Sequence, residues 1–237
     1  MTAPLAPAEF SAVFAPFARG TPERPFVVAQ IGQSLDGRVA TTSGDSKYIN
    51  GAAALDHLHR MRAHVDAVVV GVGTVVADDP QLTVRRVAGR SPARVVIDPR
   101  GRMPARAQWL ADDGARRCVV RSDSGEDSAC DGIETIAVAA SGSRLCPHAI
   151  VAELGRRGFA RILLEGGPGT ISGFLDAGAI DRLHVLVAPV LIGSGRSALD
   201  LHPIPALADA LRPSCSVYPL AGGEALFDCD LRSTAEE

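Results

Sequence analysis

Six short apolar segments spread along the chain constrain its fold most strongly. They are FVVAQIG (26–32), DAVVVG (66–71), ARVVID (93–98), RCVVR (117–121), ETIAV (134–138) and ARILLE (160–165). Such continuous apolar runs are typical of strands that are covered on both faces in a mainly parallel sheet. Between them, residues 52–64, 148–157 and 170–177 have the apolar spacing of amphipathic helices. The alternation predicts an α/β fold with helices on both faces of a central sheet.

The last quarter of the chain has a different pattern. DRLHVLVAPVLIG (181–193) predicts one long strand, and SVYPL (216–220) followed by GGEALFDCDL (222–231) predicts a closing hairpin that turns at its two glycines. The mainly parallel central sheet should therefore end in antiparallel C-terminal strands. We expect a single domain over residues 25–237, preceded by an N-terminal arm or short helix over residues 1–24.

Composition excludes several classes of partner. A chain of 237 residues with 46% hydrophobic content can bury one sizeable core. Its net charge of -3 argues against nucleic-acid binding. No apolar run approaches the roughly 20 residues that span a bilayer, and the N-terminal segment lacks the basic start of a signal peptide. We expect a cytoplasmic protein that acts on a metabolite, with neither nucleic acid nor membrane as partner.

Cysteines and histidines give no indication of a metal site. The five cysteines are scattered and include no CxxC pair, which favours reduced thiols over disulfides or zinc ligation. His57 and His59 lie two positions apart on a predicted helix and so point to different faces. We expect no bound metal.

The segment GVGTVVADDPQLTVR (71–85) places Asp78 and Asp79 side by side in a loop after an apolar strand. Open α/β sheets bind ligands beyond the carboxyl ends of their strands. The loop is therefore either a solvated turn or one side of a binding site, and the residues alone leave both possibilities open.

A second glycine-rich segment, EGGPGTISGFLDAG (165–178), joins an apolar strand to a helix. Backbone amides at such a helix start can bind phosphate, and we expect Gly166, Gly167, Gly169 and Thr170 to donate, with Gly173 allowing close packing one turn later. The spacing departs from the GxGxxG pattern of dinucleotide-binding folds. A tight strand-to-helix turn explains the glycines equally well.

Other polar residues are candidates for ligand contacts. Glu165 ends an apolar strand, and a buried carboxylate there needs a donor, either from a ligand or from a neighbouring backbone amide. Arg62 and Arg85 could hold a phosphate monoester, because guanidinium matches phosphate geometry. The hydroxyl-rich segment 34–49 could fold over a ligand, although an ordinary polar hairpin is the favoured interpretation.

Five blocks taken together resemble a known family. SLDGRVATTSGDS (34–46), the segment from HRMRAHVD to PQLTVR (59–85), VVIDPRGRMP (95–104), ILLEGGPGTISGFLDAG (162–178) and IDRLHVLVAPVLIGSG (180–195) occur in this order. They resemble the riboflavin-biosynthesis pyrimidine reductases, whose reductase domain has the dihydrofolate reductase-like fold. The resemblance runs from about Pro25 to the C-terminus. Because too few residues precede it to form the zinc deaminase domain of bifunctional members, it implies the stand-alone form.

The resemblance implies an NADPH-dependent enzyme that reduces the ribosyl group of a 5-amino-6-(5-phosphoribosylamino)pyrimidine to ribityl, as a homodimer. Family positions that contact the cofactor match Gly32, Tyr48, Thr74, Asp78, Gly167, Pro168, Gly169, Thr170, Ile171, Ser172 and Gly173. Positions that contact the phosphorylated pyrimidine match Gln30, Ser46, Arg62, Leu82, Arg85 and Glu165. The candidates for the 2′-phosphate of the cofactor are Arg100, Arg102, Arg121 and Ser122.

The resemblance also suggests roles within the site. Asp78 and Glu165 are the catalytic candidates, with Asp78 orienting sugar hydroxyls or relaying a proton and Asp79 bracing the turn before Pro80. Family members that act after deamination tend to have lysine at the position of Gln30. A glutamine leaves the deamination state of the substrate open, with some preference for the diamino compound.

Two other functions remain compatible with the sequence. The same fold could reduce a pterin or folate-like ring, although the candidate phosphate-binding arginines favour a phosphorylated substrate. Alternatively, the chain could be a non-catalytic dinucleotide-binding module, against which the presence of Asp78 and Glu165 argues.

Overall fold

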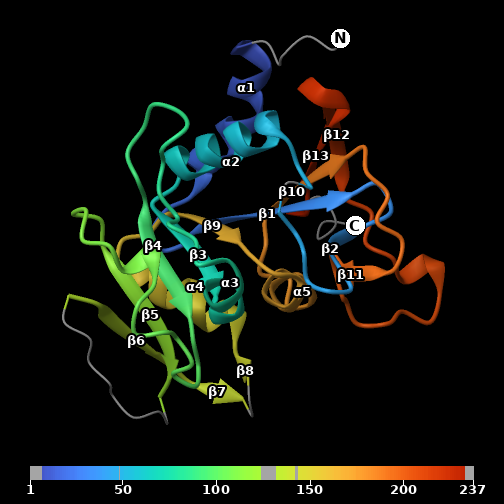
Figure 1. Cartoon of the computed structure of the whole chain (residues 1–237). Coiled ribbons are helices and arrows are strands. Elements are labelled where there is room, and N and C mark those ends of the chain that lie inside the picture. The colour runs from blue at the N-terminus through green and yellow to red at the C-terminus, as the bar shows by residue number, and fades with distance from the viewer. Residues whose placement is uncertain (1–6, 48, 124–131, 142–143, 233–237) are drawn as a thin grey trace.

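The computed structural model describes residues 7–47, 49–123, 132–141 and 144–232. Its centre is a nine-stranded sheet with the order β12-β13-β10-β1-β9-β3-β4-β5-β6 (Figure 1). The strands are β1 Phe26–Ser34, β2 Arg38–Thr41, β3 Ala67–Gly71, β4 Ala93–Ile97, β5 Arg117–Ser122, β6 Glu134–Val138, β7 Ala140–Ser141, β8 Arg144–Leu145, β9 Arg161–Glu165, β10 Arg182–Ala188, β11 Gly195–Ser197, β12 Ser214–Pro219 and β13 Ala225–Asp230.

The strand directions confirm the predicted sheet. The seven neighbours from β10 to β6 run parallel, whereas β13 pairs antiparallel with β10 and β12 antiparallel with β13. The predicted long strand over 181–193 was wrong in its extent, because β10 ends at Ala188. Pro189 follows directly, and its lack of an N–H group interrupts the hydrogen-bond ladder.

Helices cover both faces of the sheet, as predicted (Figure 1). They are α1 Pro7–Phe14, α2 Ala52–His64, α3 Val72–Asp78, α4 Pro147–Arg156 and α5 Pro168–Asp176, with short 3-10 turns η1 Ala15–Arg19, η2 Gln108–Leu110, η3 Leu207–Asp209 and η4 Ala221–Gly223. Alternate residues of each strand enter opposite cores. In β1, Val27 packs in the core that contains α4 and α5, and Val28 packs in the core that contains Met61 of α2.

The segment 71–85 is not the continuous loop that the sequence predicted. Its first half forms α3, because Val72 and Val75 are spaced to place both side chains in the core beside β3 and β4. The helix brings the paired aspartates to a defined place at its end, since Asp78 is its last residue and Asp79 caps it.

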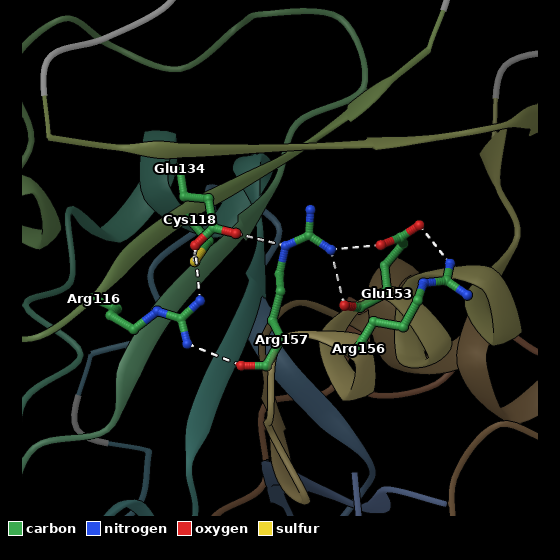
Figure 2. A network of polar contacts seen from close by, with 6 residues as sticks. All are labelled: Arg116, Cys118, Glu134, Glu153, Arg156 and Arg157. Atoms are coloured by element: carbon green, nitrogen blue, oxygen red, sulfur yellow. Dashed lines mark hydrogen bonds and ion pairs between the residues drawn. The ribbon is translucent and has the colours of Figure 1, made fainter. Parts of the chain in front are cut away.

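A polar network ties α4 to the far edge of the sheet (Figure 2). Glu134 of β6 accepts hydrogen bonds from Arg116 Nη2 at 2.8 Å and Arg157 Nε at 2.6 Å, and Arg157 also binds Glu153 at 2.5 Å. Cys118 lies beneath this network, where burial raises the pKa of its thiol to about 12. The thiol is therefore protonated at neutral pH and unreactive.

The described ranges contain four of the five cysteines, all free thiols, and Cys130 lies outside them. Within the same ranges, no group of three or more His, Cys, Asp or Glu side chains is placed to hold a metal ion. No helix there combines the length and apolarity needed to cross a membrane.

Candidate active site

A cavity of about 850 Å³ lies at the carboxyl ends of β1, β9 and β3, where the sequence predicted a site. Its floor comes from Gln30–Gly32 of β1, Val70–Gly71 of β3 and Glu165 at the end of β9. Helix α3 and the first turn of α5 also line the cavity, as do β2 and the loop that follows it. Parallel strands place their carboxyl ends at one edge of the sheet, so residues far apart in sequence meet there.

Most of the predicted site residues line this cavity. They are Gln30, Gly32, Ser46, Thr74, Asp78, Leu82, Glu165, Gly167, Pro168, Gly169 and Thr170. The structure does not bring Arg62, Arg85, Ile171, Ser172 and Gly173 to its surface, nor the 2′-phosphate candidates Arg100, Arg102, Arg121 and Ser122. Tyr48 lies outside the described residues.

The glycine-rich segment meets α3 at the start of α5. Gly167 N–H donates to Thr74 Oγ1 at 3.1 Å, and Thr170 N–H donates to the Gly167 carbonyl at 3.1 Å. Two of the four predicted amide donors are thus engaged within the protein, and a phosphate would meet those of Gly166 and Gly169. The helix has no side-chain cap. An uncapped helix start is suited to an anion because its amides carry partial positive charge.

Gly71 explains how α5 can approach so closely. A Cβ atom at this position would lie 2.4 Å from Thr170 Oγ1, so a side chain there would force Thr170 or the helix to move. The prediction that Gly173 serves close packing was wrong, because nothing lies within 4 Å of a Cβ atom added there. Next to it, Ile171 is in the core and Ser172 Oγ accepts a hydrogen bond from the amide of Asp200.

Glu165 and Arg62 form a buried ion pair. Arg62 Nε and Nη2 each bind one carboxylate oxygen of Glu165 at 2.6 Å, and Arg62 Nη1 donates to the Thr83 carbonyl at 2.9 Å. The exposed fractions of the two side chains are only 6% and 9%. Burial by itself would lower the pKa of Arg62, but the charge and hydrogen bonds of Glu165 outweigh it and the pKa is raised.

This pair corrects the expectation for both residues. The sequence predicted a ligand or a backbone amide as partner of Glu165, and a phosphate as partner of Arg62, but the structure pairs the two with each other. Three of the five N–H groups of Arg62 are therefore engaged within the protein. Glu165 still forms part of the cavity surface.

The two aspartates lie in different environments. Asp78 is exposed at the end of α3 and lines the cavity. Asp79 adopts the left-handed conformation at φ 41°, and its carboxylate accepts hydrogen bonds from the amide of Gln108 at 2.7 Å and from Gln108 Nε2 at 3.3 Å. The geometry supports the predicted division between one residue that faces the site and one that braces the turn.

Leu82 has an unusual backbone conformation for a buried leucine. Its φ is 58° and its side chain lines the cavity with 1% of the residue exposed. Such left-handed conformations cost about 1–3 kcal/mol for residues other than glycine and occur preferentially at functional sites. The neighbouring backbone is held by Arg62 at Thr83 and by His59 Nδ1, which accepts the amide of Arg85.

Gln30 occupies a central position on the floor of the cavity. It lies in β1 between Glu165 of β9 and His184 of β10, to which it is paired in register, and it is 9% exposed. An amide can both donate and accept hydrogen bonds. Gln30 is therefore placed to contact a polar edge of a bound ring.

Sequence reasoning missed Arg196, which lines the cavity. Thr41, Thr42 and Ser43 also line it, and they belong to the hydroxyl-rich segment 34–49, for which an ordinary polar hairpin was the favoured interpretation. Arg196 belongs to β11, which pairs with β2 in a separate two-stranded ribbon. A strand of only three residues in a Gly- and Ser-rich segment shows no alternation of apolar and polar residues, so the sequence did not indicate that β11 pairs with β2. A lone arginine in such a stretch is usually a solvated side chain.

Comparison with known proteins gives a consistent result. Residues 25–216 match a family model described as the RibD C-terminal domain. The 2,5-diamino-6-ribosylamino-4(3H)-pyrimidinone 5′-phosphate reductase of Methanothermobacter thermautotrophicus is 34% identical over 195 residues, which cover 80% of this chain and 90% of that protein. The riboflavin biosynthesis protein RibD of Aquifex aeolicus is 35% identical over 185 residues, or 76% of this chain and 51% of the relative.

A solved structure of a protein with a related activity has the same fold. The diaminohydroxyphosphoribosylaminopyrimidine deaminase/5-amino-6-(5-phosphoribosylamino)uracil reductase of Thermotoga maritima superposes with a TM-score of 0.72 at 29% identity, covering 87% of this chain and 56% of that one. The chain thus spans about half the length of these two longer relatives and nearly the whole length of the archaeal reductase.

We predict that removing one partner of the buried ion pair destabilises the protein strongly. Arg62→Met should lower the free energy of unfolding by about 3–5 kcal/mol, because Glu165 is left buried without a counter-charge. The double variant Arg62→Met/Glu165→Leu should lose less than the sum of the single variants, since it removes both charges. Urea denaturation measures the free energy of unfolding of the two single variants and the double variant.

The control is Arg86→Ala, which breaks the exposed ion pair with Asp56 and should cost about 1 kcal/mol or less. Additive losses would show that the pair is not coupled.

Proposed function

Because the chain belongs to the RibD C-terminal domain family, we propose that it is an NADPH-dependent reductase that converts the ribosyl group of a 5-amino-6-(5-phosphoribosylamino)pyrimidine to ribityl in riboflavin biosynthesis. Family membership confirms the resemblance inferred from the five sequence blocks. The observation that carries the proposal is that Asp78 and the uncapped start of α5 line one and the same cavity. The helix start can hold the phosphates of a dinucleotide, and Asp78 supplies a carboxylate to a sugar in the same cavity.

The residues present fit a nicotinamide cofactor. The amides of Gly166 and Gly169 are placed for a diphosphate, and a Cβ atom at Gly169 would meet nothing within 4 Å, so the space in front of the helix start is open. Gly71 and Gly73 also line the cavity and add no side chains to it. When bound, the cofactor supplies a hydride to C1′ of the opened sugar.

Asp78 is the residue placed to manage protons during this reduction. Opening of the ribosyl ring moves a proton to the ring oxygen and leaves a C1′–N double bond. Addition of hydride at C1′ and of a proton at nitrogen then gives the ribityl amine. An exposed carboxylate within hydrogen-bond reach of the sugar hydroxyls can orient them or relay these protons. Asp79 cannot do the same, since its oxygens bind Gln108.

The floor of the cavity suits the pyrimidine. Gln30 can donate to a ring carbonyl or accept from an exocyclic amine, and Glu165, held by Arg62, can accept from ring N–H groups. The archaeal relative that the chain matches along 90% of its length is named for a 2,5-diamino substrate. These two points support the diamino compound as the preferred form.

We predict turnover of the phosphorylated pyrimidine with NADPH. Oxidation of NADPH, followed at 340 nm, should accompany reduction of both candidate substrates, with the diamino form giving the higher kcat/KM. Replacing NADPH by NADH should raise the cofactor KM, and removing the 5′-phosphate of the substrate should abolish most turnover. Absence of turnover with either phosphorylated pyrimidine would contradict the proposal.

The two aspartates should differ in the effect of neutralisation. Asp78→Asn should lower kcat by about 100-fold or more, a typical contribution of acid–base catalysis, with little change in the free energy of unfolding. Asp79→Asn should retain most of kcat and lose about 1 kcal/mol of stability, because one oxygen no longer accepts as a carboxylate. Steady-state kinetics and thermal denaturation of both variants test the division. Equal losses of kcat at unchanged stability would rule it out.

We propose that the enzyme is a cytoplasmic homodimer. Exposed apolar side chains are concentrated on the C-terminal segment, at Val190, Leu191, Leu201, Ile204, Leu207, Leu211 and Val217. Exposed apolar side chains that form a contiguous surface commonly mark a protein interface, and we propose that these residues do so. Light scattering should give twice the mass of one chain, 24.6 kDa. A monomer at micromolar concentration would contradict this part of the proposal.

A further inference from the structure

We propose that Arg196 binds a phosphate group of the cofactor, so that the β2–β11 ribbon forms a second phosphate contact in the cavity that the start of α5 also lines. The inference rests on the proposed function and deepens it. It assigns a binding residue outside every segment that the sequence had suggested for the cofactor. The ribbon consists of Arg38–Thr41 and Gly195–Ser197.

The charges of the cavity single out Arg196. Among the described residues that line it, the ionisable side chains are Asp78, Glu165 and Arg196. Glu165 is neutralised by its buried partner Arg62, which leaves one carboxylate and one guanidinium. NADPH carries a diphosphate and a 2′-phosphate, and the two available amides of α5 cannot neutralise them all. Arg196 is exposed, and within the described part of the chain its guanidinium has no hydrogen-bond or ion-pair partner.

The ribbon holds Arg196 in a fixed position. Asp36 accepts the amides of Ile192 at 3.1 Å and Gly193 at 2.6 Å just before β11. The hydrogen bond from Ser34 and those from the two amides lower the pKa of Asp36 to about 2, so its carboxylate is ionised in any ordinary assay.

A second anchor comes from the other strand. Arg38 Nε donates to the Gly193 carbonyl at 3.0 Å, and its Nη1 donates to Ser197 Oγ at 2.7 Å. The register shifts between Arg196 and Ser197, and such β-bulges commonly redirect a side chain beside a site. These contacts fix the backbone that carries Arg196, so ligand binding has to order only its side chain.

The chain that follows β11 shows on which side of the cavity Arg196 lies. Asp200 N–H donates to Ser172 Oγ at 2.9 Å, and His202 N–H donates to Asp176 Oδ1 at 3.2 Å. The segment therefore follows α5 from its middle toward its end as the residue number increases. Figure 1 shows β2 and β11 beside α5, and Arg196, four residues before Asp200, lines the same cavity as Pro168, Gly169 and Thr170 of the first turn of α5. This is the end that carries the proposed diphosphate site, so the cofactor rather than the pyrimidine is the expected partner.

Direct binding measurements test the proposal without catalysis. The dissociation constants of NADPH and NADH are measured by calorimetry for the wild-type chain and for Arg196→Ala, Arg196→Lys and Arg212→Ala. We expect Arg196→Ala to weaken NADPH binding about tenfold or more, the usual effect of one charge-assisted hydrogen bond, and Arg196→Lys to weaken it less. Arg212 is an exposed arginine that contacts the Leu207 carbonyl away from the cavity, and its replacement should change nothing. Thermal denaturation checks that each variant is folded.

Comparing NADPH with NADH, which lacks the 2′-phosphate, shows which phosphate of the cofactor Arg196 binds. A loss confined to NADPH places the 2′-phosphate on Arg196, and equal losses for NADPH and NADH place the diphosphate there; both support the proposal. Unchanged NADPH affinity in Arg196→Ala, or a tenfold rise only in the KM of the pyrimidine, overturns it. If the wild-type chain itself fails to bind NADPH, the proposed function fails together with the role of Arg196. If the wild-type chain binds NADPH and Arg196→Ala binds it equally well, only the role of Arg196 fails.

Discussion

The buried ion pair between Arg62 and Glu165 is the interaction on which the geometry of the cavity depends. Neither charge could remain in this position alone, since an unpaired buried ion costs several kcal/mol. The pair joins α2 to the end of β9, and through the Thr83 carbonyl it also holds the segment that follows the paired aspartates. Leu82, next to Thr83, keeps a left-handed backbone while its side chain is buried in the cavity. The floor of the site and its strained loop are thus stabilised by one contact.

The other contacts around the cavity fix its backbone and leave protein groups free to bind a ligand. Thr74 accepts the amide of Gly167, which fixes α3 against α5 but uses one of the donors at the helix start. Gly71 permits this approach because a side chain there would overlap Thr170. The β2–β11 ribbon, which also lines the cavity, is held by Asp36 and Arg38, both far in sequence from the segments they hold. Rigid surroundings of this kind keep polar groups in place for binding.

The proposed chemistry requires little from the protein beyond placement. Hydride comes from the cofactor, so the side chains have to bind two phosphorylated molecules, orient the sugar and move protons. The exposed carboxylate of Asp78 at the end of α3 is sufficient to move protons, and the carboxylate of Asp79 accepts the backbone amide of Gln108. Two adjacent residues of the same type can therefore have unrelated roles, because one turn of backbone directs them to opposite environments.

The sequence alone determined the class of the fold and much of the site. Apolar runs predicted the parallel strands and the paired glycines at 222–223 predicted the closing hairpin, because these features depend on local hydrophobicity and on short-range backbone geometry. The family was inferred from the resemblance of the five ordered blocks. Most of the site residues that the resemblance implied line one cavity. Only the tertiary structure showed that Arg62 serves Glu165 instead of facing the cavity, that Gly173 packs against nothing, and that Arg196 reaches the cavity from a strand of three residues. Each of these facts depends on which distant segment a side chain meets, and no local pattern in the chain encodes that choice.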